Sequence, residues 1–248
     1  MEAEDGSSLL TETLAPLLGV VTATLIFLAP LSDVRQIALT GELADFNPIP
    51  LGFIVTNALS WILYSLLVRN FYIFWSNVSG FCLGLYYIVS ALGARDVPAS
   101  ARSLVTTVFT AGPFLILIGF HVAFLVVNPD DPDKARSLGG WICVAALLAF
   151  YTSPLSTLHH VLLTRDASSF SYPLSLACVL NGALWTVYGL VIGDGFVWAP
   201  NAVGAVVGVV QVGLLVVFGR GEGAGGVGRG KVQGYRAVES DEDGVEEG

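Results

Sequence analysis

The chain has 248 residues, of which 54% are hydrophobic and 12% are charged, and its formal net charge is −9. Soluble domains carry about 25% charged residues, so this composition excludes a soluble globule, which could not bury so much apolar surface. Six acidic residues lie in the last ten positions, after a Gly-rich run. This pattern predicts a disordered, solvated tail over 219–248, in which phosphorylation of Ser240 stays an open question.

Seven stretches without Asp, Glu, Lys or Arg follow one another along the chain. Each has about 20 residues or more, which is the length that a helix needs to cross the hydrocarbon core of a bilayer. They cover residues 13–32, 46–68, 71–94, 103–129, 137–164, 167–193 and 195–219. The sequence therefore predicts an all-α membrane protein with seven transmembrane helices.

The first span is expected to be retained, because the N-terminal segment is acidic where a signal peptide is basic, and no small-residue cleavage pattern follows it. Basic residues near span ends are distributed unequally between the two sides of the membrane. One side has Arg35, Arg95, Arg102, Arg165 and Arg220, and the other has Arg69, Lys134 and Arg136. The positive-inside rule then places the N-terminus outside and the C-terminus in the cytoplasm. Residues 1–12 are accordingly expected to form an extracellular tail.

The sequence repeats itself at a shift of 124 residues, and the repeat preserves uncommon residue types. Pro30-Leu31-Ser32 falls on Pro154-Leu155-Ser156; Asn57, Trp61 and Tyr64 fall on Asn181, Trp185 and Tyr188; Asn77, Gly80 and Gly84 fall on Asn201, Gly204 and Gly208. We therefore predict two three-helix units, over 13–94 and 137–218, joined by a linker helix over 103–128. Because four spans separate the copies, both units run in the same direction through the bilayer.

Both repeats resemble the SWEET (MtN3/saliva) family of sugar transporters, in which parallel repeats are known. The resemblance covers about residues 17–218 and rests on LAPLSDVRQ…NALSWILYSLL with FWSNVSG, and on TSPLSTLHH…LNGALWTVYGL with WAPNAVG. The related PQ-loop carriers have Pro-Gln where this chain has Pro30-Leu31 and Pro154-Leu155, which favours the SWEET branch. The resemblance implies two parallel three-helix bundles around a linker helix and bidirectional facilitated transport of mono- or disaccharides such as glucose or sucrose.

A sugar needs amide groups for its hydroxyls and flat aromatic surfaces for its C–H faces. The repeat supplies two of each, Asn77 and Asn201 with Trp61 and Trp185. The resemblance implies that the two Asn contact the sugar and that the two Trp sandwich it. The alternative is that these Asn join helices and that these Trp lie at the headgroup belt. For Asn57 and Asn181, packing and binding explain the sequence equally well.

Prolines near span ends can break a helix where it lines a cavity or a moving seam. Pro30, Pro50 and Pro154 resemble three members of a proline tetrad that lets each unit of a SWEET transporter bend. Ser171 stands at the fourth position, where the family has proline, and Pro173 is a candidate to replace it.

The resemblance also implies an extracellular gate at Tyr64, Asp194 and Pro200, in which a Tyr–Asp hydrogen bond would close the mouth. The alternative for Asp194 is a surface turn between Gly193 and Gly195, because Asp and Gly are common turn residues.

No nucleophile–base pair, phosphate loop or metal-ligand spacing occurs, so we expect no enzyme, cofactor or metal site. Cys82, Cys143 and Cys178 are expected to be packing residues. No Asp or Glu lies in the middle of a span, whereas coupled carriers usually bury one, which favours a uniporter.

Two alternatives stay open, a proton-coupled carrier of amino acids or organic ions of the PQ-loop type and a seven-helix receptor that transports nothing. The expected partners are a sugar and the lipid bilayer, without nucleic acid, and a homo-oligomer is compatible with the sequence. The plasma membrane is the expected location, with the vacuolar and Golgi membranes as alternatives.

Overall fold

The computed structural model describes residues 8–44 and 46–219, except for the side chains of residues 153 and 154. The acidic tail after residue 219, including Ser240, lies outside these residues, as do the first seven residues of the expected N-terminal tail.

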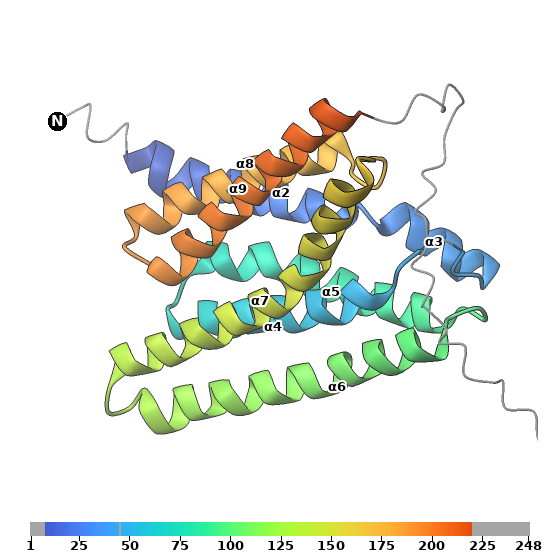
Figure 1. The fold of residues 1–248 in the computed structure, drawn as a ribbon. Helices are drawn as coiled ribbons and strands as arrows, with labels where there is room; N and C mark the ends of the chain where they lie inside the picture. The colour runs from blue at the N-terminus through green and yellow to red at the C-terminus, as the bar shows by residue number, and fades with distance from the viewer. Residues whose placement is uncertain (1–7, 45, 220–248) are drawn as a thin grey trace, which may run out of the picture.

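Every regular element in the described part of the chain is a helix, and seven helical segments are long and apolar enough to cross a membrane. They are η1 (Leu9–Leu14), α2 (Ala15–Leu28) and α3 (Leu31–Thr40) as the first; α4 (Ile49–Leu67); α5 (Phe71–Leu92); α6 (Ala99–His121) with η2 (Val122–Val127); α7 (Pro132–Thr164); α8 (Tyr172–Val191); and α9 (Gly195–Phe218). The prediction of an all-α membrane protein with seven spans is confirmed (Figure 1).

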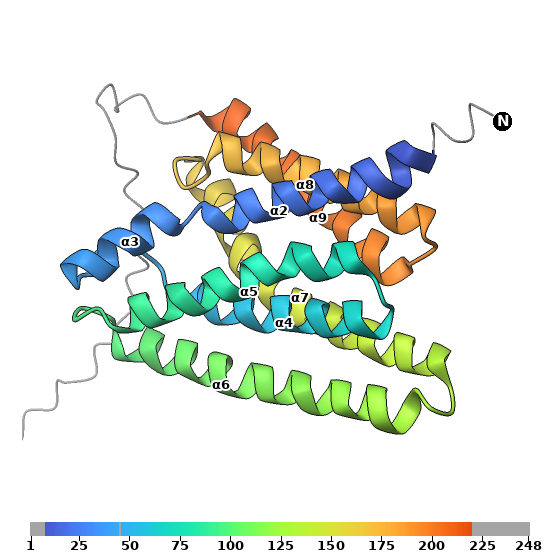
Figure 2. The same ribbon diagram turned by 180° about the vertical axis from the view of Figure 1, so that it is seen from behind.

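In each unit the third helix lies between the other two. α5 packs against both α2 and α4, and α9 packs against both α7 and α8. The units meet where α2 contacts α8 and where α4 contacts α7. Six helices therefore form a ring, while the linker α6 packs outside it against α4 (Figures 1 and 2). The arrangement of two bundles and a linker is confirmed; the helix order inside each bundle is a finding of the structure.

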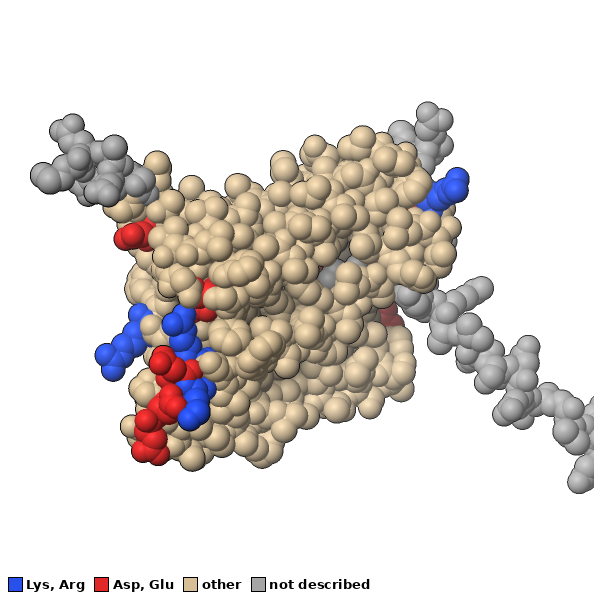
Figure 3. Space-filling view, turned by 60° about the vertical axis from the view of Figure 1, so that its left-hand side comes forward, with Lys and Arg blue, Asp and Glu red and all other residues tan. Residues whose placement is uncertain are grey.

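The bundle has two ends, which we name by their residues. The "Tyr64 end" carries the connections at residues 68–70, 128–131 and 192–194, and the "proline end" carries those at 41–48, 93–98 and 165–171. Two repeat-related side chains begin helices at the Tyr64 end: Asn70 Oδ1 accepts the N–H of Ile73, and Asp194 Oδ1 accepts the N–H of Phe196. Figure 3 shows charged side chains gathered at this end and a broad surface without charges beside it, as a membrane-spanning protein requires.

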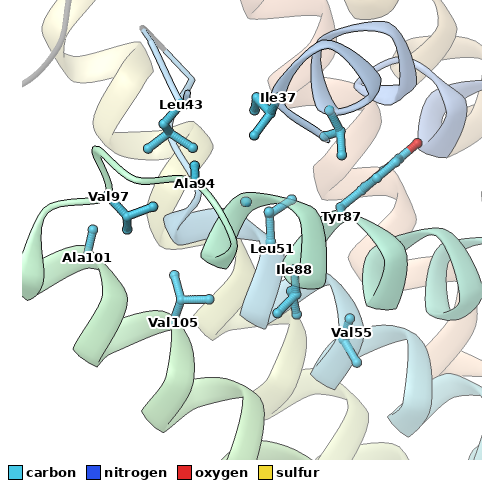
Figure 4. Close-up of a cluster of buried hydrophobic side chains, with 12 residues drawn as sticks. Ile37, Leu43, Leu51, Val55, Tyr87, Ile88, Ala94, Val97, Ala101 and Val105 are labelled. Atoms are coloured by element: carbon cyan, nitrogen blue, oxygen red, sulfur yellow. The ribbon is translucent and has the colours of Figure 1, made fainter. Parts of the chain in front are cut away.

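The first unit has an apolar core at the proline end (Figure 4). It contains Leu51 of α4 and Tyr87 of α5, each 2% exposed, and extends to Val105 of α6. The carboxylate of Asp96 fastens the loop before α4 to this core, because it accepts the N–H groups of Leu43 and Ala44 at 2.6 and 3.1 Å. These N–H groups, that of Leu43 above all, hold the pKa of Asp96 below its usual value.

A glycine contact sets the distance between α8 and α9. A Cβ at Gly189 would lie 2.6 Å from the backbone nitrogen of Trp198, whereas a Cβ at Gly213 would meet no atom within 4 Å. Gly189→Ala should therefore lower stability by about 1–3 kcal/mol through overpacking, measured as a lower melting temperature in detergent. Gly213→Ala is the matched control and should leave the melting temperature unchanged or slightly raised. Equal melting temperatures for both variants would contradict this packing.

Candidate functional site

A cavity with a volume of about 530 Å³ lies inside the six-helix ring. Its wall includes all four predicted binding residues: Trp61 of α4, Asn77 of α5, Trp185 of α8 and Asn201 of α9. The two repeats thus contribute the same two residue types to one space, and the structure brings together the residues that the sequence singled out.

The two predicted Asn side chains are held in the same way. Asn77 Nδ2 donates to the carbonyl of Ile73 at 2.9 Å, and Asn201 Nδ2 donates to the carbonyl of Val197 at 2.7 Å. Neither Oδ1 atom accepts a hydrogen bond from another described residue. Each amide is therefore fixed by its own helix and presents an acceptor oxygen that can receive a proton from a ligand hydroxyl.

The two predicted Trp side chains are buried, with 7% of Trp61 and 5% of Trp185 exposed, whereas a Trp of the headgroup belt lies on the outer surface of a membrane protein. Each indole packs edge-to-face on the tyrosine three residues later: Trp61 on Tyr64 at 5.7 Å and Trp185 on Tyr188 at 5.8 Å between ring centroids. Gly19 of α2 lets Trp185 approach, because a Cβ there would lie 2.9 Å from Nε1 of the indole. The cavity thus has a rigid aromatic floor toward the Tyr64 end.

Asn57 and Asn181, for which binding and packing were equally compatible, also line the cavity. Asn181 Oδ1 accepts the hydroxyl hydrogen of Thr22 at 2.9 Å, so this side chain joins α8 to α2. Asn57 Oδ1 is buried and has no hydrogen-bond partner among the described residues. An unsatisfied buried acceptor costs about 1–3 kcal/mol, and a ligand hydroxyl in the cavity would satisfy it.

An ionic contact between a buried carboxylate and a partly exposed guanidinium closes the ring at the Tyr64 end. The hydroxyl of Tyr64 donates to Asp194 Oδ2 at 2.8 Å, and Arg136 Nη2 lies 3.0 Å from the same oxygen. Asp194 is 1% exposed and Tyr64 is fully buried. The predicted Tyr–Asp hydrogen bond is present, and Asp194 is also the turn residue that caps α9; its function as a gate stays a prediction.

A second hydrogen bond joins the two units at the Tyr64 end, and the repeat relates it to the Tyr64–Asp194 hydrogen bond. Asn70 Nδ2 donates to the hydroxyl of Tyr188 at 2.8 Å, and Asn70 corresponds to Asp194 at the shift of 124 residues. The ring contacts correspond as well, Tyr64 with Phe196 and Tyr188 with Tyr72. Sequence reasoning missed Asn70 and Arg136, although the repeat places Asn70 opposite Asp194.

The predicted hinge residues divide into two groups. Pro30, Pro50 and Ser171 line the cavity toward the proline end, whereas Pro173 does not. Pro30 lies at the break between α2 and α3, Pro50 is the second residue of α4, and Pro173 is the second residue of α8. α7 passes residue 154 in one helical run. The bending function of all these positions stays a prediction.

Pro200, expected at the gate, lies inside α9 beside Asn201. Its carbonyl accepts the hydroxyl hydrogen of Tyr151 at 3.5 Å. None of the hydrogen bonds or ion pairs found for Tyr64, Asp194 and Arg136 among the described residues involves it. Its function at the gate therefore stays a prediction without a contact to support it.

A protein-family model described as "Sugar efflux transporter for intercellular exchange" (MtN3_slv) matches this chain twice, over residues 14–91 and 137–222. The chain belongs to the SWEET (MtN3) family. Two relatives are the bidirectional sugar transporters SWEET13 of Oryza sativa subsp. japonica and N3 of Medicago truncatula. They are 30% and 29% identical, over 87% and 83% of this chain and 73% and 75% of their own.

A solved structure of a eukaryotic SWEET transporter has the same fold, with a TM-score of 0.75 at 22% identity over 84% of this chain and 97% of the other. Membership of a family of sugar transporters agrees with the prediction that this SWEET chain is a membrane transporter and not an enzyme.

The two halves of the closed end should differ in strength. Asp194→Ala removes the partner of Tyr64, of Arg136 and of the Phe196 N–H, and it leaves a guanidinium without its carboxylate. Asn70→Ala removes two uncharged hydrogen bonds. Hydrogen bonds to charged groups contribute about 1.5–3 kcal/mol against about 0.5–1.5 for neutral ones, so the melting temperature in detergent should fall further for Asp194→Ala.

The exposed Asp130 of the same end provides the control for this comparison. Asp130→Ala should leave the melting temperature unchanged. A loss for Asn70→Ala that equals or exceeds the loss for Asp194→Ala would show that the ionic half does not dominate the closure.

Proposed function

We propose that this SWEET chain is a bidirectional uniporter for sugars that works by alternating access, with the cavity as its binding site. One observation carries the proposal: two repeat-related Trp and Asn pairs face a single cavity whose far end is closed by Tyr64 and Asp194. Sugar hydroxyls donate to the free Oδ1 atoms of Asn77 and Asn201. The indoles of Trp61 and Trp185 cover the C–H faces of the ring and exclude water.

The conformation of the six-helix ring supports one half of this cycle. The cavity extends to Pro30, Pro50 and Ser171 at the proline end, while the Tyr64 end is closed. With the N-terminus outside, as the positive-inside rule favours, the structure represents the state that faces the cytoplasm. Passage to the outward-facing state requires the Tyr64–Asp194 and Asn70–Tyr188 hydrogen bonds to break.

Transport without ion coupling is favoured by the cavity wall. Among the described residues that line it, there is no Asp, Glu, Lys, Arg or His. A proton-coupled carrier of the PQ-loop type usually buries such a group at membrane depth. Asp33 lies three residues after Pro30, which lines the cavity, but its own side chain is exposed on α3.

The plasma membrane is the proposed location, and the family's description as serving intercellular exchange supports it. One chain already encloses the cavity with six helices, so the site is complete without a partner subunit, whether or not homo-oligomers form.

Radiotracer uptake into proteoliposomes tests the function directly. The wild-type chain should equilibrate glucose or sucrose at a rate that an imposed pH gradient leaves unchanged. Asn201→Ala should lower the rate about tenfold or more, because it removes a fixed hydrogen-bond partner of the substrate. Uptake that depends on the pH gradient would contradict the uniporter.

Asn128→Ala is the matched control for Asn201→Ala, since Asn128 ends η2 outside the cavity. It should transport like the wild-type protein. A melting temperature near the wild-type value should accompany the loss of uptake in Asn201→Ala. Unchanged uptake in Asn201→Ala would remove this residue from the site, and a wild-type protein that carries no sugar would favour the receptor alternative.

A further inference from the structure

The half of the cavity toward the proline end contains a polar pair that the proposed site does not use. Ser175 of α8 and Gln211 of α9 both line the cavity, and the Ser175 hydroxyl donates to Gln211 Oε1 at 3.4 Å. Ser175 is 3% exposed. The Nε2 amide group of Gln211 donates to no described residue. The pair therefore holds the carboxamide in place while its two N–H donors stay available to a ligand.

The pair exists in only one of the two repeats. At the shift of 124 residues, Ser175 corresponds to Leu51 and Gln211 corresponds to Tyr87, and both of these side chains are sealed in the apolar core of the first unit (Figure 4). The hydroxyl of Tyr87 donates a hydrogen bond to the carbonyl of Phe27 at 2.8 Å. The repeat therefore relates the Trp and Asn residues of the central site but not the polar residues of the cavity toward the proline end.

The first unit contributes apolar side chains to the same half of the cavity, among them Phe27, Pro50 and Ile54. A wall with hydrogen-bonding groups from α8 and α9 and apolar surface from the first unit suits a sugar ring, which has hydroxyls at its edge and C–H groups on its faces. This half of the cavity thus combines hydrogen-bonding and apolar groups, as the central site does, but without a Trp side chain.

The two polar levels are too far apart to act on one ring. Asn201, Gly204, Val207, Gly208 and Gln211 line the cavity along one face of α9. Ten residues of helix rise about 15 Å, and because helical side chains tilt toward the N-terminus, the Gln211 side chain leans toward Asn201. The glycines between them let neighbouring helices approach α9, since a Cβ at Gly204 would lie 2.7 Å from the Tyr151 hydroxyl and one at Gly208 would lie 2.8 Å from the Val179 side chain.

We propose that Gln211 and Ser175 form a second sugar position, which holds the second ring of a disaccharide whose first ring occupies the Trp and Asn site. Gln211 Nε2 donates to hydroxyl oxygens of that ring, and its C–H face packs against the apolar side chains of the first unit. This inference rests on the proposed function and adds the substrate class, because a monosaccharide at the central site does not reach Gln211.

The test compares two sugars in the same proteoliposomes. Gln211→Met keeps the length of the side chain and removes its donors; it should raise the KM for sucrose about fivefold to tenfold and leave the KM for glucose within about twofold. Ser175→Ala should shift the sucrose KM in the same direction by a smaller factor. Ser65→Ala is the control, because Ser65 is an equally buried serine whose hydroxyl donates to the carbonyl of Ile62 outside the cavity.

Each other outcome decides against the inference. Sucrose and glucose KM values that change together, or not at all, would show that the pair only packs α8 against α9. A wild-type protein that carries glucose but not sucrose would overturn the second position and leave the proposed function intact, whereas one that carries neither sugar would overturn both. If Gln211→Met does not fold, the ratio of sucrose to glucose KM in Ser175→Ala decides: an unchanged ratio overturns the proposal.

Discussion

The structure depends on one buried carboxylate. Asp194 is 1% exposed where the two units meet, and a buried charge is tolerated only with partners that replace water. Tyr64 of the first unit and Arg136 of the second supply them. The contact therefore ties the units together at one end and leaves the other end free to enclose the cavity. In the proposed outward-facing state, the tyrosine leaves and water takes its place at Asp194.

The proposed binding site and the closed Tyr64 end share a helical turn in each unit. Trp61 and Tyr64 lie three residues apart on α4, as Trp185 and Tyr188 do on α8, and each pair is in ring contact. Residues at this spacing lie on the same face of a helix. Each indole therefore touches both the cavity, where a ligand would lie, and the tyrosine of the closed end. Rotation of α4 or α8 that displaces a tyrosine also moves the indole of the site.

The repeat made most of the architecture predictable, and its limits explain what was missed. Residues that recur unchanged, such as Trp61 with Trp185, were found by matching identical types, and the cavity contains them. Matching identical residues does not single out Asn70, because its counterpart is Asp194, or Gln211, because its counterpart is Tyr87. The position of α5 between α2 and α4 depends on packing between surfaces, which hydropathy along a single span does not encode.

The two units also differ at the positions that the sequence predicts as hinges. The first span breaks at Ala29 and Pro30, after which α3 leaves the line of α2 (Figures 1 and 2), whereas α7 runs as one helix through the corresponding residue 154. A break removes backbone hydrogen bonds and concentrates bending at one residue. Asp96 fastens the loop after α3 to the core of the first unit. At the same end of the second unit, the buried residues Val161, Ala167 and Phe170 pack the end of α7 and the loop after it against Leu215 and Phe218 of α9. Both units are therefore braced at the proline end, and the break at Pro30 is what distinguishes the first.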